Sequence, residues 1–576
     1  MGRKKDPQSD YRMSEHRTKG YVYASTQRTV TLADGRTVRR HVHWGRVAGG
    51  RFEPSARFLR LSAEERAKFS FPERWTVEER PAEENPSGER PATGNRLYGD
   101  VWLLEQIARR TGLREDLDAV FAGSPPGTAD AVLALAIYLV ATGWNFDRAA
   151  RWQRIAKTPC ERTLTPKRIT LLAQSITDGH RAELLRRRAA RVGPDAAAAM
   201  DSTSISTWGV SLADARWGRN KDHLPLEQIL DVTVYDLDAH LPAYYRAFPG
   251  NVPDSRTLRA VREDLRAFGL HPAARITDRG YASLANLDEA IRGGEGILTA
   301  VKTSWGPVAE RIAAFGRFDT IPKGMRLDPD SGLAWAQYDW TRTVDAGGRK
   351  LSGTLHINLY LNPVRRTAEV LEMETTAEAE RRVLAAAKAS RKPVEDREGL
   401  ESWLKWHDAT FTKRGAVKSF ALRERAWKER RARAGFFASA THGLDWSAME
   451  AHRHYRRRDE QEKYFQQKKG LMGADRPRSW SEEGWNGRQL ILFAGLILSC
   501  ALRETWKRSL RKVCASTLEV LDEMRSIRCI EHPGRSPVVT PFVGKQLEIA
   551  RAFGFEPPEG CAPSTPPRPH RRKNSE

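Results

Sequence analysis

The order of apolar and amphipathic segments between residues 196 and 303 constrains the fold more than any other feature of the chain. Short apolar, β-branched runs predict strands at 196–207, 229–237, 243–248, 273–280 and 296–303. A helix with a Ser cap and a Gly stop is predicted at 255–270, and a second helix precedes the last strand. Three successive strands followed by alternating strands and helices predict a mixed sheet flanked by helices.

The 576-residue chain divides by composition on either side of this core, which makes it a multidomain α/β protein. We expect a small basic β-rich module at 1–77, a Pro-, Gly- and Glu-rich linker at 78–97, a helical domain at 98–195, the first part of the core at 196–303, an α+β insertion at 304–434, the second part of the core at 435–510, and a C-terminal helical region with a basic disordered tail at 511–576. The N-terminal module either binds DNA or only packs, and the helical domain is a possible DNA-binding element.

Two aspartates stand where predicted strands emerge from apolar sequence. Asp201 follows AAAAM, and Asp278 follows ARIT. A carboxylate at the end of a buried strand is held rigidly and is partly desolvated, which suits a ligand of a divalent metal ion. Aspartates at strand ends are also common turn formers, so neither residue identifies a site alone.

A long helix predicted at 447–470 carries a third carboxylate with cations beside it. Tyr455, Arg458, Glu462 and Lys469 are spaced Y-x2-R-x3-E-x6-K, and these offsets place all four side chains on one helical face. A carboxylate flanked by Arg and Lys suits a metal-assisted reaction at a phosphodiester. The alternative is a solvated charged helix, because this segment carries charge on several faces.

Together the two aspartates and this helix resemble the DDE insertion-sequence transposases, whose catalytic core is ribonuclease H-like. More narrowly, the chain is similar to the branch that has the YREK motif and an insertion between the second Asp and the Glu. Asp201 and Asp278 are 77 residues apart, and Asp278 and Glu462 are 184 residues apart, which leaves room for an insertion. The motifs DSTS at the first Asp and DRG at the second also resemble the family.

The resemblance implies an enzyme that cleaves and transfers DNA strands, with roles for the matching residues. Asp201, Asp278 and Glu462 would bind two Mg²⁺ or Mn²⁺ ions, which activate the attacking oxygen and stabilise the leaving one. Tyr455, Arg458 and Lys469 would hold DNA phosphates.

Two further DNA contacts are expected beside these. Arg279 is a further candidate for a phosphate contact, or pairs with a nearby carboxylate. In the enzymes that this chain resembles, an indole of the insertion stacks on a base flipped from the duplex end, and the resemblance makes Trp305 the candidate for that role. His452 and His454 are interpreted as an exposed pair on the helix.

The charge balance agrees with a nucleic-acid partner. The chain has 96 Lys and Arg residues against 73 Asp and Glu residues, a formal net charge of +23. Such a surplus attracts a polyanion through counterion release. The resemblance to the transposases implies the particular partners: double-stranded DNA, namely terminal repeats and target DNA, and a second copy of the chain in the DNA complex.

Cysteine spacing and hydropathy indicate a reducing compartment and no membrane. Five widely spaced cysteines give neither a disulfide framework nor a zinc motif. The longest apolar run, 490–502, is too short to cross a bilayer and predicts a buried helix. We expect a cytoplasmic, nucleoid-associated bacterial protein.

Three other hypotheses compete with the transposase. A metal-dependent nuclease of the same fold would share the acidic triad but has no need of the insertion or the YREK helix. An inactive or domesticated transposase would only bind DNA. A basic chromatin-like protein would explain the charge but not the four residues on one helical face.

Overall fold

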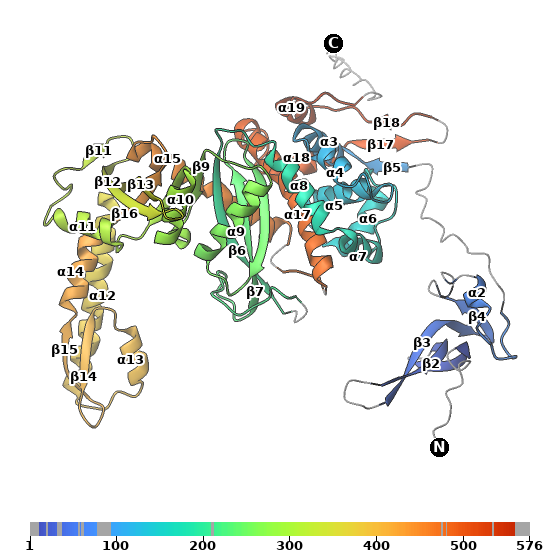
Figure 1. Ribbon diagram of the computed structural model, residues 1–576, viewed down its shortest axis with the longest axis horizontal. Helices are drawn as coiled ribbons and strands as arrows, with labels where there is room; N and C mark the ends of the chain where they lie inside the picture. Colours follow the sequence, from blue (N-terminus) through green and yellow to red (C-terminus); the bar gives the residue numbers. More distant parts are fainter. Residues whose placement is uncertain are drawn as a thin grey trace, which may run out of the picture. The chain divides into compact units, whose positions relative to one another are not determined.

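The structure, a computed structural model, forms two compact units, Met1–Glu89 and Arg90–Glu576 (Figure 1). It describes residues 11–558 apart from 19–20, 32–36, 56–57, 59–60, 62, 78–93, 144, 209–211, 474–475, 480 and 533–534. Most of the linker expected at 78–97 and the tail expected at the C-terminus lie outside the described residues. Within the linker range, residues 94–97 form a strand.

The first unit is a small antiparallel sheet with an aromatic core. Its four strands follow one another in sequence order: β1 (Ser14–Thr18), β2 (Tyr21–Thr31), β3 (Thr37–Ala48) and β4 (Arg51–Pro54). A one-turn helix follows, α2 (Ala63–Arg66). Phe52, Phe58, Phe69 and Trp75 are buried against one another, so a short segment gains a core from large rings.

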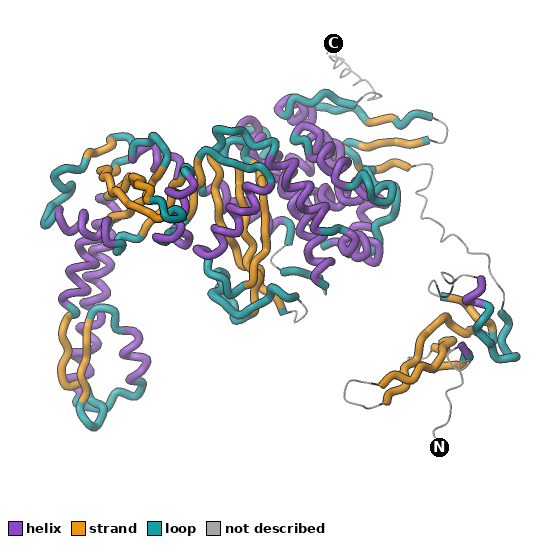
Figure 2. Tube along the Cα trace, in the orientation of Figure 1, coloured by secondary structure: helices purple, strands orange, loops and turns teal. Residues whose placement is uncertain are grey.

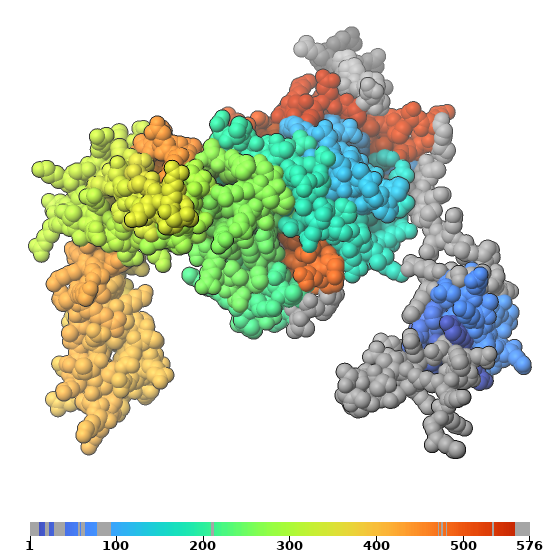
Figure 3. Space-filling view, viewed as in Figure 1, coloured from blue at the N-terminus to red at the C-terminus, as the bar shows by residue number. Residues whose placement is uncertain are grey.

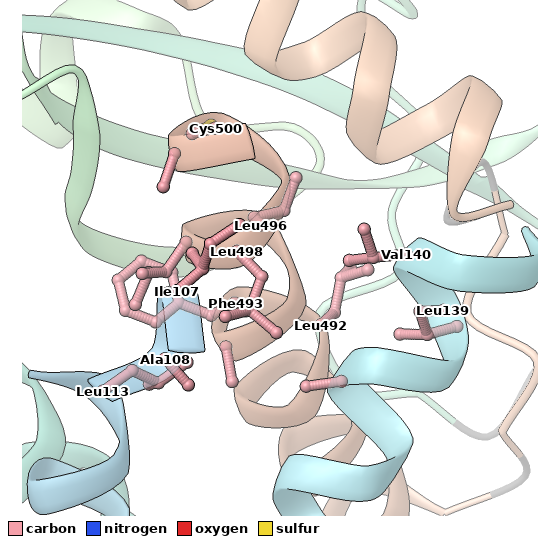
Figure 4. Close-up of a cluster of buried hydrophobic side chains, with 14 of the residues drawn as sticks. Ile107, Ala108, Leu113, Leu139, Val140, Leu492, Phe493, Leu496, Leu498 and Cys500 are labelled. Carbon is pink, nitrogen blue, oxygen red and sulfur yellow. The ribbon is translucent and has the colours of Figure 1, made fainter. Parts of the chain in front are cut away.

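A helical layer begins the second unit. Its members are α3 (Gly99–Arg110), α4 (Leu113–Val120), α5 (Thr128–Thr142), the 3₁₀ turn η2 (Phe146–Arg148), α6 (Ala149–Ile155), α7 (Pro166–Ser175) and α8 (Asp178–Ala189). They pack around α17 (Glu482–Thr505), which is apolar over most of its surface. Figure 4 shows Leu492, Phe493 and Leu496 of α17 beside Ile107 of α3 and Val140 of α5.

α17 is the buried helix that the apolar run predicts. With the π-helical η5 (Trp506–Leu510), it is long and apolar enough to cross a membrane by composition alone. However, 89% of its most apolar stretch is buried inside the protein, as expected of a core helix.

Nine strands form the central sheet, in the order β11-β12-β13-β16-β10-β9-β6-β7-β8 (Figure 2). They are β6 (Ala197–Thr207), β7 (Glu227–Asp236), β8 (Leu241–Pro249), β9 (Ala274–Thr277), β10 (Ile297–Val301), β11 (Arg326–Asp328), β12 (Leu333–Asp345), β13 (Lys350–Leu361) and β16 (Phe436–His442). The pairs β6–β9 and β9–β10 are parallel and the other pairs are antiparallel. The mixed sheet predicted from the sequence is therefore confirmed.

Short helices join the strands of the core. They are α9 (Asp254–Ala267), the 3₁₀ turn η3 (Arg279–Tyr281), α10 (Leu284–Gly293) and α11 (Gly306–Ala314). α9 ends before Gly269, whose φ of +76° favours glycine, as predicted. The predicted Ser cap is wrong, because α9 begins after Pro253 without a side-chain cap. Gly296 is required before β10, since a Cβ there would lie 2.0 Å from the carbonyl oxygen of Ala273.

The segment expected as an insertion, 304–434, differs from the prediction in its first half. β12 and β13 join the central sheet rather than a sheet of their own, because β13 pairs along β16 over six residue pairs. Only 363–434 stands apart, as α12 (Pro363–Ser390), α13 (Arg397–Trp403), the hairpin β14 (His407–Phe411) and β15 (Val417–Leu422), and α14 (Glu424–Arg433).

The C-terminal part of the second unit follows β16. It contains α15 (Ala448–Arg457), α16 (Asp459–Gln466), the π-helical η4 (Gln467–Leu471), α18 (Thr517–Arg525) and α19 (Lys545–Ala552). The region was expected to be helical beyond 511, but it also supplies β17 (Arg528–Glu531) and β18 (Val538–Val539). These strands pair with β5 (Gly94–Leu97) in a three-stranded sheet.

Candidate active site

Asp201 and Asp278 lie on neighbouring strands of the central sheet. β9 pairs in parallel with β6, and its last residue, Thr277, is opposite Met200. The next residue on each strand is an aspartate, so the register places the two carboxylates side by side. Asp278 directly follows the end of β9, whereas Asp201 lies within β6, which continues along β7 to Thr207.

The two carboxylates have different environments. Burial raises the pKa of Asp201 and the negative charge of Asp278 adds to this rise, while Lys221 and Arg458 oppose it. Burial would also raise the pKa of Asp278, but the backbone N–H of Arg279, the Arg458 charge and the Tyr455 hydroxyl outweigh it. The pKa of Asp278 therefore lies below its ordinary value. Two adjacent carboxylates shifted in opposite directions are typical of a functional site.

Glu462 completes the acidic group from a helix. The guanidinium of Arg458 donates from Nη1 to Oδ2 of Asp201 at 2.8 Å and from Nη2 to Oε1 of Glu462 at 2.7 Å. The side chains of Asp201 and Arg458 are 14% and 13% exposed, whereas that of Glu462 is 49% exposed. Arg458 thus connects a buried carboxylate with one that faces solvent.

Tyr455 connects the remaining carboxylate to the same cluster. Its hydroxyl donates to Oδ1 of Asp278 at 2.9 Å, and the Arg458 guanidinium lies 5.5 Å from its ring centroid. Burial would lower the pKa of Arg458, but Tyr455 and the three acidic residues raise it above its ordinary value. Asp201, Asp278 and Glu462, far apart in sequence, therefore surround one guanidinium.

The helix predicted at 447–470 is divided into shorter pieces. α15 begins at a capping box formed by Ser447 and Glu450. α15 ends before Arg458, whose φ of −56° and ψ of −25° remain helical, so α16 continues in nearly the same direction. Tyr455, Arg458 and Glu462 therefore still share a face. The π-helical turn η4 changes the phase beyond α16.

Lys469 lies on that π-helical turn and is not in contact with the acidic triad. Its Nζ is 2.8 Å from both carboxylate oxygens of Asp222. The preceding residue, Lys468, is buried and donates to Asp231 of β7 at 2.6 Å. Lys469 was expected on the same helical face as Tyr455, Arg458 and Glu462. It lies instead beside the loop between β6 and β7, where it pairs with Asp222.

That loop also supplies a cation that sequence reasoning missed. Nζ of Lys221 donates to the backbone oxygen and the hydroxyl of Ser202, at 2.8 and 2.6 Å, and lies 3.1 Å from Oδ2 of Asp254. The Ser202 hydroxyl in turn donates to Oδ1 of Asp254 at 2.7 Å. Lys221 follows no periodic pattern, so only the fold reveals that its charge opposes the rise in the pKa of Asp201 that burial causes.

Other expected contacts are less central. Arg279 is exposed in η3, and its backbone N–H rather than its side chain contacts Asp278. Trp305 precedes α11 and packs edge-on against Trp340, with ring centroids 5.0 Å apart, so it is partly buried in a core cluster. Among the described residues Trp208, directly after β6, is far more open at 75% exposed.

The two helix histidines are not an exposed pair. His454 stacks on Trp446 with ring centroids 4.0 Å apart, and His452 packs against Tyr360. Burial lowers the pKa of both imidazoles, with Arg456 adding to this for His452 and Arg457 for His454. They pack α15 onto the sheet and its neighbouring loop.

The acidic residues fit a hard divalent cation by their chemistry. Carboxylate oxygens are ligands that Mg²⁺ and Mn²⁺ take. Within the described part of the chain, no three His, Cys, Asp or Glu side chains are close enough together to hold a metal ion. Since Arg458 lies between Asp201 and Glu462, a metal ion shared by the carboxylates requires Arg458 to release at least one of them.

Comparison with known proteins identifies the family. The model of the transposase DDE domain family matches residues 193–496, more than half of the chain, and this range includes Asp201, Asp278 and Glu462. No curated protein matches the chain. Among solved structures, the piggyBac transposase synaptic complex with hairpin DNA, determined by cryo-EM, matches with 11% identity and a TM-score of 0.32. The match covers 74% of this chain and 70% of that chain. On the strength of the family match alone, the chain belongs to the transposase DDE domain family.

Proposed function

We propose that this chain is the transposase of an insertion sequence and that it cleaves and transfers DNA strands with two divalent metal ions. The observation that carries the proposal is the convergence of Asp201, Asp278 and Glu462, from three distant parts of the chain, on Arg458. A structural role alone would not require a partly exposed carboxylate in such a group. The spacing of Tyr455, Arg458, Glu462 and Lys469 supports the YREK branch.

The strand order supports a ribonuclease H-like core. The five strands β8-β7-β6-β9-β10 are consecutive in the sheet, and among them only β7 runs antiparallel to its neighbours. The first Asp lies on the central strand of these five and the second follows the adjacent strand. The third carboxylate comes from a helix beyond the segment 363–434, which we assign as the insertion.

The three carboxylates would hold the ions, and the cations beside them would hold DNA. Bound divalent ions make a hydroxyl more nucleophilic and stabilise the charge on the leaving oxygen. Arg458 and Lys221 are next to Asp201 and would contact phosphate oxygens once the carboxylates are occupied. Tyr455 holds Asp278 in place through its hydroxyl. Lys469 and Arg279 would contact phosphates farther along the strand.

The assembly and location follow from the same proposal. Bringing two element ends together requires more than one active site, so the chain would act as a homodimer on terminal repeats and target DNA. Its place would be the bacterial nucleoid in the cytoplasm. The net charge of +23 supports a DNA partner.

The test is cleavage of labelled duplexes that carry the ends of the encoding element, with and without Mg²⁺. Wild type and Asp201→Asn are compared, with DNA binding measured in parallel. Metal-dependent nicking at the ends by wild type but not by Asp201→Asn is the expected result. Binding without cleavage by either protein would instead favour an inactive, DNA-binding relative.

A further inference from the structure

The cations of segment 363–434 differ in their partners along its length. On the sides of the helices they form ion pairs with carboxylates, for example Arg381 with Glu378, Arg425 with Glu429 and Lys428 with Glu424. These pairs follow the three- and four-residue spacings at which helical side chains meet. Here the positive charge is largely matched.

At the end of the segment farthest from the sheet, several cations form no ion pair, although Glu395 and Asp396 are exposed on the same connection after α12. Six exposed basic side chains lie on the last turn of α12, the chain that follows it, and the β14–β15 hairpin: Lys388, Arg391, Lys392, Lys413, Arg414 and Lys418. The structure describes all of 363–434, and no carboxylate of the described residues forms an ion pair with any of these six. We call this group the basic tip.

The two parts of the basic tip are fixed to each other. The backbone N–H of Val394 donates to the carbonyl oxygen of Gly415 at 3.1 Å, which joins the segment after α12 to the turn of the hairpin. Beneath them, Leu384, Leu404 and Val417 form a small buried core. The six charges are therefore held on one folded surface and are not on separate loops.

Glu380 anchors this end more firmly. Its carboxylate is fully buried on α12 and accepts backbone N–H groups of Lys405, Trp406 and His407, the last of which begins β14. A buried carboxylate satisfied by several N–H donors fixes the hairpin to the helix. The basic tip thus keeps its arrangement before any ligand binds.

Arg391 provides backbone evidence that a cation has a role here. It has φ +54° and ψ 12°, the left-handed conformation that glycine and asparagine adopt at least cost. The position follows the end of α12, where glycine is the usual residue. A non-glycine residue held in such a conformation points to a function for its side chain.

We propose that the basic tip binds the phosphate backbone of duplex DNA, outside the DNA held at the acidic triad. α12 has 28 residues, and at about 1.5 Å per residue it extends roughly 40 Å from β13. That length equals about 12 base pairs at about 3.4 Å each, or roughly one turn of duplex. Lys and Arg on flexible stems suit phosphates, so the contact is independent of sequence. Figure 3 shows this segment in yellow and orange.

The test measures DNA binding without divalent metal, by fluorescence anisotropy of the full chain at several salt concentrations. The tip variant combines Arg391→Gly, Lys392→Gln, Lys413→Gln and Arg414→Gln. A matched control removes four paired charges of the same segment, through Arg381→Gln, Arg382→Gln, Arg425→Gln and Lys428→Gln. Both variants are titrated with duplexes of about 12 and about 40 base pairs, with and without element ends.

We expect the tip variant to bind the longer duplex at least about tenfold more weakly at low salt. Its slope of log affinity against log salt should fall by about 0.9 for each phosphate that the tip no longer neutralises. The affinity of the tip variant for the short duplex, and the affinity of the control variant for either duplex, should change much less. The loss of affinity should be the same for duplexes with and without element ends. Equal weakening in the tip and control variants, or an unchanged slope in the tip variant, would overturn the proposal.

The single change Arg391→Gly tests whether weaker DNA binding by the tip variant results from misfolding. Glycine suits the left-handed conformation, so the thermal midpoint should stay the same or rise while the salt slope falls by about one. The inference rests on the proposed function for its DNA ligand, but binding needs no metal or cleavage. If no protein, wild type included, cleaved DNA while the tip variant still bound DNA more weakly than wild type, the proposed catalytic function would be wrong. The proposal that the basic tip binds DNA would still hold.

Discussion

At the scale of single residues, Arg458 has a different immediate role from the one its motif suggests. The motif predicts a phosphate contact, yet the guanidinium donates to Asp201 and Glu462. A cation among three carboxylates reduces their mutual repulsion, as a metal ion would. Under the proposed function, Arg458 would compete with the metal ions for the same oxygens, and DNA binding would draw it toward phosphate.

This competition predicts the effect of Arg458→Gln on metal binding. Without the guanidinium, no cation bridges Asp201 and Glu462 and only Lys221 remains near Asp201, so Mn²⁺ should bind about tenfold more tightly, equivalent to about 1.4 kcal/mol. Titration of free Mn²⁺ followed by electron paramagnetic resonance measures this without DNA. Arg457→Gln is the matched control, because Arg457 pairs with Asp238 instead. Weaker Mn²⁺ binding by Arg458→Gln would show that the arginine supports the metal site.

At the scale of elements, the sequence predicted the type of most segments but not their pairing. Apolar runs located β6 to β10, and helical spacing located the group of Tyr455, Arg458 and Glu462. The strand predicted at 196–207 already contains Asp201, but the sequence did not indicate that β6 outlasts its parallel partner β9 and continues along β7. Pairing of that kind depends on chain segments far apart in sequence, which periodicity does not report.

Other differences have the same physical origin. β12 and β13 were predicted to belong to an insertion because nothing local indicates that β16, many residues later, pairs beside β13. The π-helical turn at 467–471 arises where Lys468 reaches the buried Asp231, a tertiary contact that helix propensity does not contain. Lys221 was not predicted as a site residue because its loop shows neither a hydrophobic periodicity nor a motif.

The buried ion pair of Lys468 and Asp231 predicts a large stability effect. Both side chains are 2% exposed and their Nζ–Oδ2 distance is 2.6 Å. Lys468→Met leaves a buried carboxylate without its partner and should cost about 3–5 kcal/mol in the free energy of unfolding. The double change Lys468→Met with Asp231→Leu should recover most of that loss. Urea unfolding measures both.

A control for this pair lies next to it in sequence. Lys469 pairs with Asp222, whose side chain is 37% exposed, so Lys469→Met should cost less than about 1 kcal/mol. If Lys468→Met cost no more than Lys469→Met, the buried pair would not stabilise η4 against the sheet.

The ion pairs of Glu295 should make a pH-dependent contribution to the stability of the part of the sheet that positions Asp278. It precedes β10 and lies 2.7 Å from Arg275 of β9 and 2.8 Å from Arg262 of α9. Burial would raise its pKa, but the two arginines outweigh burial and lower it. A lowered carboxylate pKa stabilises the fold above the unfolded value of about 4.3, and this contribution is lost as pH falls through the folded pKa.

Glu295→Gln should therefore destabilise the protein by about 3 kcal/mol at neutral pH, since it removes the carboxylate that pairs with buried Arg275 and one of the two that pair with buried Arg262. The difference from wild type should shrink as pH falls through the lowered folded-state pKa of Glu295, because below that pKa the carboxyl is protonated in both the folded and the unfolded state. Unfolding midpoints across pH measure this. Glu263→Gln is the control, because the Arg259–Glu263 pair is exposed. A difference that persists unchanged in acid would contradict the assignment.

At the scale of the whole molecule, the sheet assembles one site from three distant segments. Asp201 comes from β6, Asp278 from the end of β9, and Glu462 from α16, after the chain has passed through 363–434 and returned through β16. The central claim is that the third carboxylate of this site is Glu462. Glu460, on the same helix, contacts His240 instead and so offers a matched comparison.

The most direct test compares metal-dependent nicking of end-bearing DNA by wild type, Glu462→Gln and Glu460→Gln, with binding measured alongside. We predict that Glu462→Gln lowers the nicking rate by roughly three orders of magnitude while DNA binding is retained, because a ligand of the reacting ions is lost. Glu460→Gln should nick within a few-fold of wild type. Full cleavage by Glu462→Gln would contradict the assignment of the third carboxylate and, with it, the proposed active site.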